Sequence, residues 1–212
     1  MNDSRALRMR IIATAREMNA LGINRGKSGN VSARIDPGFL ITPSALPYDE
    51  TKPGDIVTVD LGGNATGPRR PSTEWRFHRD IYAARPEVRA IVHTHSPFAT
   101  ALACLDRDIP AFHYMVAVAG GSDIRCASYS TFGTQALSDH AVAALEGRKA
   151  CLLSHHGMIA LGASLASALA LAVEVETLAE MYCHALSLGE PALLGEEEMS
   201  VVVDRFAAYN RP

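Results

Sequence analysis

The segment VRAIVHTHSP, residues 88–97, decides the fold. Its apolar first half predicts a buried strand, and His93 and His95 follow directly after it. Side chains along a strand alternate between its two faces, so residues two apart point the same way. The two imidazoles are therefore expected to converge on one point, as they do where proteins bind a divalent transition metal.

A third imidazole is available farther along the chain, in the sequence SHHG at residues 154–157. Either His155 or His156 could supply it, and the glycine that follows permits close approach of the backbone. Three protein ligands would leave one coordination position open, which is typical of a catalytic metal site. The competing interpretation is that these histidines are ordinary core or surface residues, because short motifs also occur by chance.

Outward from this segment, the periodicity of apolar residues predicts alternating helices and strands. The expected helices cover residues 3–21, 71–84, 97–104, 134–145, 165–188 and 196–209, and the expected strands cover residues 31–35, 39–42, 56–60, 88–92 and 149–153. A hairpin signal early in the chain favours a mainly antiparallel or mixed sheet flanked by helices on both faces. We therefore expect an α/β fold, and the length favours a single domain over residues 1–212.

Composition narrows the choice of partners. The net charge is −3 and the isoelectric point is near 6.2, so there is no general attraction to nucleic acid or to an anionic membrane. No run of about 18 apolar residues occurs, and the first residues lack the pattern of a signal peptide. We expect a cytoplasmic protein with no nucleic-acid partner and no membrane partner.

Glu74 lies in the sequence PSTEWRFH, residues 71–78, at the expected start of a helix. A glutamate at this position is a common capping residue. If the start of the helix abuts the metal, the same carboxylate would instead serve as a general acid and base. The sequence leaves both interpretations open.

Tyr114 lies in an irregular segment, beside His113 and before a flexible glycine pair. Its phenol is either packed in the core or free to reach a partner site. Four other histidines show no ligand spacing and are interpreted as structural or surface residues: His78, His113, His140 and His184.

Three loops combine small hydroxyl or amide side chains with glycine or proline: residues 28–30, 42–44 and 71–73. Backbone amides in such loops and at helix starts form good phosphate sites, and hydroxyl groups add donors without bulk. Ordinary turns use the same residues, so each loop alone is weak evidence.

In combination, these motifs resemble the class II aldolase/adducin family, and within it the L-fuculose-1-phosphate aldolase branch. The similarity extends over almost the whole chain. It is carried by GNVS (29–32), ITP (41–43), STEWRFH (72–78), HTH (93–95), HYM (113–115), TFGT (131–134) and HHG (155–157).

The resemblance implies one zinc ion per subunit, with Glu74 as a fourth ligand before substrate binds and as the acid and base afterwards. The implied zinc ligands are His93, His95 and His156, and the implied phosphate site comprises Gly29, Asn30, Ser44, Ser72 and Thr73. Ala45, at a position where the branch usually has glycine, completes the substrate-binding set. The family assembles as a homotetramer with shared active sites, so Tyr114 would serve a neighbouring subunit. Phe132 and Tyr209 would wall the aldehyde pocket.

The expected function is a zinc-dependent aldolase acting on a small phosphorylated sugar. It would cleave a ketose 1-phosphate reversibly to dihydroxyacetone phosphate and an aldehyde. Departures from the branch at residues 27–28, 45 and 96–98 leave the aldehyde open. L-Fuculose 1-phosphate, a 5-deoxypentulose 1-phosphate and methylthioribulose 1-phosphate are the candidates.

Other proteins on this scaffold define the alternatives, since a fold does not fix a function. A sugar-phosphate epimerase or a decarboxylase would use the same centre. A non-catalytic adducin-like binding module is disfavoured, because it would need neither the three histidines nor Glu74.

Overall fold

The computed structural model describes residues 3–209, without the side chains of residues 207 and 209. Its strands are β1 (Asn30–Arg34), β2 (Phe39–Ile41), β3 (Val57–Val59), β4 (Ala65–Thr66), β5 (Ala90–Thr94), β6 (Cys126–Ala127), β7 (Ala150–Leu153) and β8 (Gly157–Gly162). Its α-helices are α1 (Arg5–Ala20), α2 (Trp75–Ala84), α3 (Pro97–Ala103), α4 (Gln135–Ala144), α5 (Leu165–Leu188) and α6 (Glu196–Tyr209). Two short 3-10 helices are η1 (Pro53–Asp55) and η2 (Tyr114–Ala119).

The strands form one eight-stranded sheet in the order β4-β3-β2-β1-β5-β8-β7-β6. Every neighbouring pair is antiparallel except β6 and β7, which are parallel. The predicted mainly antiparallel or mixed sheet is therefore confirmed. The strand that carries His93 lies in the middle, between β1 and β8, where both of its edges are paired.

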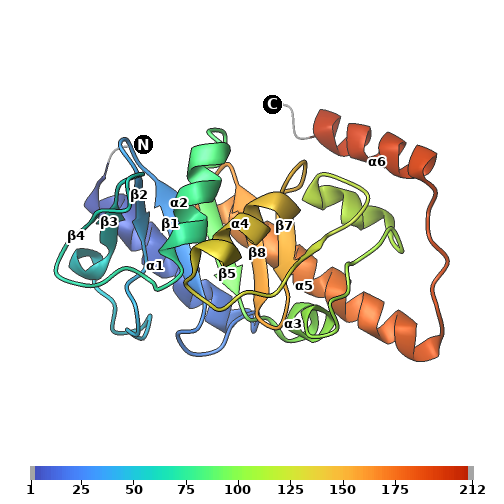
Figure 1. The fold of residues 1–212 in the computed structure, drawn as a ribbon, viewed down its shortest axis with the longest axis horizontal. Coiled ribbons are helices and arrows are strands. Elements are labelled where there is room, and N and C mark those ends of the chain that lie inside the picture. The colour runs from blue at the N-terminus through green and yellow to red at the C-terminus, as the bar shows by residue number, and fades with distance from the viewer. Residues whose placement is uncertain (1–2, 210–212) are drawn as a thin grey trace.

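Helices cover both faces of this sheet, as the sequence predicted. Figure 1 shows α2 and α4 over one face, with α1 and α5 behind the other. The alternation along β5 explains the two layers, because Ile91 packs with the residues of α2 and α4 whereas Val92 packs with those of α1, α3 and α5. His93 has the same parity as Ile91 and therefore points toward α2.

The longest helix, α5, begins and ends at the predicted residues. Ser164 caps it by accepting a hydrogen bond from the backbone N–H of Ser167, and Gly189 ends it. Its apolar side chains are buried against α1, α3, η2 and the sheet. No helix in the described part of the chain has the length and apolar composition needed to cross a bilayer.

The sequence missed three strands, β4, β6 and β8, and placed the start of α2 too early. Two of these strands have only two residues, which is too short for a periodic pattern. The helix begins at Trp75, because residues 71–74 form a bridge and a turn before it. The shift leaves Glu74 at the N-cap position of α2.

The last helix, α6, lies apart from the sheet at the end of a connecting segment (Figure 1). It packs against η2, and the backbone N–H of Leu194 just before it donates to the carbonyl oxygen of Ala111 over 2.9 Å. Tyr114 begins η2 and is half exposed.

Candidate metal centre

Three histidines meet at one end of the central strands because of the register between β5 and β8. Thr94 pairs with Met158, so the end of β5 lies beside the turn that precedes β8. His93 lies on β5, His95 directly follows that strand, and His156 comes from this turn. The ring centroids of the three imidazoles lie 4.8 to 5.0 Å apart. The predicted convergence of His93 and His95 is therefore present in the structure.

Gly157 allows this close approach. A Cβ atom at this position would overlap the carbonyl oxygen of Thr94 and lie 3.1 Å from Cδ2 of His95. His155, the neighbour of His156, has a positive φ of 52°, and its exposed ring packs edge-on against Tyr129. The structure thus brings His156 into the cluster and leaves His155 outside it.

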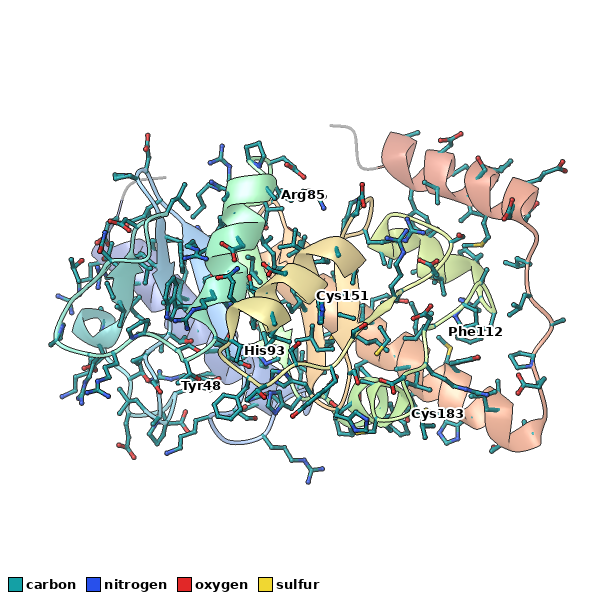
Figure 2. All side chains as sticks on the ribbon, in the orientation of Figure 1. Tyr48, Arg85, His93, Phe112, Cys151 and Cys183 are labelled. Carbon is teal, nitrogen blue, oxygen red and sulfur yellow. The ribbon has the colours of Figure 1, made fainter. Side chains whose placement is uncertain are left out.

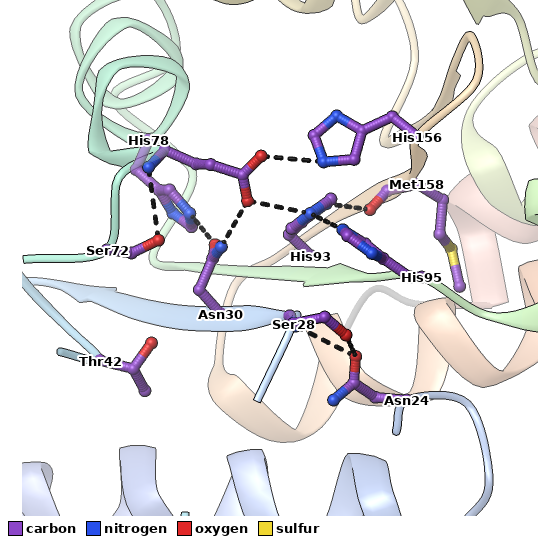
Figure 3. A network of polar contacts seen from close by, with 12 residues as sticks. Asn24, Ser28, Asn30, Thr42, Ser72, His78, His93, His95, His156 and Met158 are labelled. Carbon is purple, nitrogen blue, oxygen red and sulfur yellow. Dashed lines mark hydrogen bonds and ion pairs between the residues drawn. The ribbon is translucent and has the colours of Figure 1, made fainter. Parts of the chain in front are cut away.

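Glu74 completes the group from the N-terminal end of α2. Its side chain makes no capping hydrogen bond and is 5% exposed. Its Oε2 lies 3.1 Å from Nε2 of His93, and its Oε1 lies 2.8 Å from Nε2 of His156. The capping interpretation of Glu74 is therefore wrong, and the carboxylate faces the imidazoles of His93 and His156, which are labelled in Figure 3.

The donor set fits a divalent metal. One ligand atom from each of Glu74, His93, His95 and His156 lies within 4.8 Å of the others. Ligand atoms around a tetrahedral zinc ion lie about 3.3 Å apart, given bonds of about 2.0–2.1 Å. The two contacts of Glu74 are close to this value, and so is the 3.1 Å between the Nε2 atoms of His93 and His95.

A buried atom without a hydrogen bond and an imidazole lone pair also indicate a cation site at the centre. Nδ1 of His93 faces the carbonyl oxygen of Met158 at 2.9 Å and must donate to it, which leaves a lone pair on Nε2. Oε1 of Glu74 is buried and, despite its short approach to His156, has no hydrogen bond of good geometry. A cation at the centre would satisfy both atoms.

Electrostatics favour the metal-binding protonation states. Burial lowers the pKa of His95 to about 4, and repulsion from His93 and His156 adds to this shift. Burial alone would raise the pKa of the Glu74 carboxyl, but attraction to the adjacent imidazoles of His93 and His156 outweighs it and holds that pKa below its usual range. His95 is thus neutral and Glu74 ionised near neutral pH.

Behind Glu74 lies a buried chain of polar groups. Asn30 Nδ2 donates to Glu74 Oε2 over 2.8 Å, and Asn30 Oδ1 lies 2.5 Å from Nε2 of His78. The other nitrogen of His78 lies 2.7 Å from Oγ of Ser32, which lies 2.8 Å from the hydroxyl of Tyr82. Burial, with repulsion from His93, lowers the pKa of His78 to about 3, so this imidazole is neutral.

From the sequence, His78 was interpreted as a structural or surface residue, and its place in this chain was not predicted. A sequence signal existed, because His78 follows Glu74 by four residues and such residues share one face of a helix. Arg85 follows the end of α2 that lies away from the labelled His93 (Figure 2), and the polar chain runs along the helix from Glu74, before its first turn, to Tyr82 in its last turn.

The residues expected to bind phosphate lie beside the centre, but several of their donors are already used. The N–H of Gly29 donates to the side chain of Asn24, and the N–H of Ser44 donates to the carbonyl oxygen of Arg70. Ser72 is buried and accepts from the N–H of Glu74, whereas Thr73 is exposed.

Ala45, the remaining member of the expected substrate-binding set, has a positive φ of 59°, which suits the glycine usual at that position. Its carbonyl oxygen accepts from Nζ of Lys27 over 3.0 Å. A cavity of about 470 Å³ lies next to Ser44 and Thr73, and two guanidinium groups, Arg70 and Arg76, line it.

The aldehyde-side residues are divided between two places. Phe132 is exposed and lines the cavity at the metal centre together with Tyr129 and Ser28. Tyr114 lines a separate cavity under α6, so within one chain it does not reach the metal centre. The side chain of Tyr209 lies outside the described residues. Phe98, at one of the departures from the branch, contacts the ring of His184 and is absent from the residues that line the metal-centre cavity.

Comparison with known proteins gives a consistent result. Residues 9–183 match the Class II Aldolase and Adducin N-terminal domain family. A 5-methylthioribulose-1-phosphate/5-deoxyribulose-1-phosphate aldolase of Rhodospirillum rubrum is 58% identical over 204 residues, covering 96% of this chain and 92% of the relative. An L-fuculose phosphate aldolase of Escherichia coli (strain K12) is 48% identical and covers 96% and 95%. A solved L-fuculose 1-phosphate aldolase superposes with a TM-score of 0.94 at 39% identity, covering 97% of this chain and 98% of that chain.

Proposed function

The chain belongs to the class II aldolase and adducin family, and on that premise we propose that it is a metal-dependent aldolase that cleaves a ketose 1-phosphate reversibly to dihydroxyacetone phosphate and an aldehyde. The observation that carries the proposal is the buried cluster of three imidazoles and one carboxylate beside an open cavity. Relatives of high identity are named as aldolases, which disfavours the epimerase, decarboxylase and binding-module alternatives.

Zinc is the ion we propose for the centre, one per subunit, because a donor set of three imidazoles and one carboxylate suits it. His93, His95 and His156 would hold it, with Glu74 as a fourth ligand in the absence of substrate. When bound, the ion supplies a Lewis acid that offsets the negative charge developing as the C3–C4 bond breaks.

The protein's own groups would move the protons. The C4 hydroxyl gives up its proton as the bond breaks and the aldehyde forms, and the bonding electron pair remains on the dihydroxyacetone phosphate half. With Glu74 displaced from its ligand position by substrate, its carboxylate would take up a proton from solvent and deliver it to C3. Tyr114 of a neighbouring subunit would take the C4 hydroxyl proton. This role is supported by the exposure of Tyr114 and by its position at a cavity separate from the metal centre of its own chain. This role requires the homotetramer that we propose as the working form.

The phosphate would lie among Gly29, Asn30, Ser44, Ser72 and Thr73, next to Ala45. The hydroxyl groups of Ser44 and Thr73 line the adjoining cavity, where the charges of Arg70 and Arg76 favour an anion. Phe132 and Tyr209 would wall the aldehyde side. The exposed aromatic rings of Phe132 and Tyr129 support an apolar aldehyde, as a 5-deoxypentulose 1-phosphate or methylthioribulose 1-phosphate would release.

One assay tests the proposal. The zinc-loaded protein is incubated with L-fuculose 1-phosphate, 5-deoxyribulose 1-phosphate and methylthioribulose 1-phosphate, and dihydroxyacetone phosphate is followed by coupled reduction with glycerol-phosphate dehydrogenase. We expect product from at least one substrate and the highest kcat/KM with an apolar leaving aldehyde. No product from any of them, at full metal occupancy, would overturn the proposal.

A further inference from the structure

The chain of hydrogen bonds behind Glu74 can run in one direction only. A carboxylate only accepts hydrogen bonds, so the amide of Asn30 must turn its Nδ2 toward Glu74 and its Oδ1 toward His78. His78 must then donate from Nε2, which leaves Nδ1 as an acceptor for the hydroxyl of Ser32. The hydroxyl of Tyr82 in turn donates to Ser32.

The members of this chain are buried. His78 and Ser32 are 0% exposed, Tyr82 is 1% exposed and Asn30 is 2% exposed. Water therefore cannot replace a lost partner without rearrangement, and an amide freed from His78 could rotate and turn its oxygen toward Glu74. In Figure 3, Asn30 and His78 lie on the side of the site away from His156.

The two oxygens of Glu74 differ as a result. Oε2 accepts from Asn30 and lies beside His93, so a proton there would oppose the N–H of the amide. Oε1 faces His156 and has no hydrogen bond of good geometry.

We propose that His78 is a positioning residue that acts through Asn30: it holds Oε2 of Glu74 as an acceptor, so that Oε1 carries the proton that Glu74 transfers. The inference rests on the proposed function, in which Glu74 is the proton carrier. His78 itself hydrogen-bonds to Ser32 and Asn30 and is absent from the residues that line the metal-centre cavity.

Two substitutions at one position separate this role from a purely structural one. In His78→Gln, the amide nitrogen can take the place of Nε2 and keep the donor to Asn30. In His78→Asn, the shorter side chain can still accept from Ser32 but cannot reach Asn30. We expect His78→Asn to lower kcat about 10- to 100-fold with KM changed less than about threefold, and His78→Gln to keep kcat within about threefold. Zinc content should equal that of the wild type in both.

A second comparison uses Glu74→Gln as the background. With the proton carrier already removed, His78→Asn should lower kcat by less than about twofold, because both changes affect one step. Equal losses of kcat in His78→Asn and His78→Gln, a normal kcat in His78→Asn, loss of zinc from His78→Asn, or full additivity with Glu74→Gln would each overturn the inference.

The wild type provides a test that needs neither a variant nor turnover. Long-range proton–nitrogen NMR spectra of the zinc-loaded protein with labelled histidine should show His78 as the neutral Nε2–H tautomer. An Nδ1–H tautomer or a charged imidazolium would overturn the inference even if every variant failed to fold. Failure of the wild type on all ketose phosphates would overturn the proposed function and this inference together, whereas normal wild-type turnover with a normal His78→Asn would overturn the inference alone.

Discussion

His93 and Met158 are joined by a hydrogen bond of 2.9 Å from the imidazole Nδ1 to the backbone carbonyl oxygen. This bond ties a side chain of β5 to the backbone of β8 and turns Nε2 of His93 toward Glu74 and His95. The metal centre is therefore organised by the register of the sheet, and not only by the sequence motif that contains the histidines.

Removal of the third imidazole should strip the metal. We expect His156→Ala to lower zinc affinity by more than the roughly 10- to 100-fold that loss of a ligand's hydrogen-bond partner costs. Zinc per subunit, measured by elemental mass spectrometry after dialysis against a weak chelator, provides the readout. The matched control is His155→Asn, because asparagine tolerates the positive φ at this position. Undiminished zinc in His156→Ala, or loss confined to His155→Asn, would reverse the assignment of the third ligand.

Glu74→Gln should separate metal binding from proton transfer. The amide of glutamine can still accept from Asn30 Nδ2, so we expect the fold and the three-histidine site to persist. General acid and base groups contribute about 10²- to 10⁴-fold to rates, so kcat should fall within that range. Steady-state kinetics and zinc content are measured on the same sample. A normal kcat with full zinc occupancy would exclude Glu74 as the proton carrier.

Several elements were predictable because they have strong local signals. The bounds of α5 and α6 agree with the apolar periodicity, and the convergence of His93 and His95 follows from the period of a strand. The length and apolar character of α5 made its burial predictable as well. These predictions depend on residues that are close together in the sequence.

The rest depended on contacts between distant segments. Nothing near Glu74 in the sequence indicates that its side chain turns away from the helix end, since its partners His93 and His156 lie on other elements. The role of Asn30 as a link between Glu74 and His78 likewise requires β1 to lie beside β5, which is a property of the sheet order. The contribution of Tyr114 to a neighbouring centre stays a prediction.

Gly157→Ala should destabilise the protein and loosen the metal centre. The added methyl group would overlap the carbonyl oxygen of Thr94, in the strand pair that aligns the histidines. We expect a loss of about 1–3 kcal/mol in the free energy of unfolding, as overpacking typically costs, together with weaker zinc binding. Gly54→Ala is the control, because nothing lies within 4 Å of the added atom, and it should change stability by less than about 0.5 kcal/mol. Equal stability of the two variants would contradict the prediction.

Glu176→Ala should weaken the support of the segment that follows His95. The buried carboxylate of Glu176 accepts from the backbone N–H groups of Phe98 (2.8 Å) and Ala99 (2.9 Å), at the start of α3. Hydrogen bonds to a charged group contribute about 1.5–3 kcal/mol each, so we expect a loss of at least about 2 kcal/mol in urea unfolding. Glu180→Ala, at an exposed position one turn later in α5, should have little effect. A loss as large in Glu180→Ala would show that the hydrogen bonds to the start of α3 are not responsible.

Acid should destabilise the metal-free protein through His78. In the unfolded chain an imidazole binds a proton as the pH falls below about 6.5, whereas in the folded protein the pKa of His78 is about 3. Between these values the unfolded state binds more protons, so the free energy of unfolding falls as the pH falls. The depressed pKa of His95 acts in the same direction over a narrower range. Glu74 adds to the loss only below the usual pKa of a carboxyl, because its own pKa is held lower in the folded state.

We expect His78 alone to contribute a slope of up to about 1.4 kcal/mol per pH unit. Urea unfolding of the chelator-treated wild type and of His78→Gln at about pH 7, 6 and 5 measures this slope, and the variant should be less sensitive to acid. Parallel stability curves for the two proteins would mean that His78 does not stay neutral in the folded state.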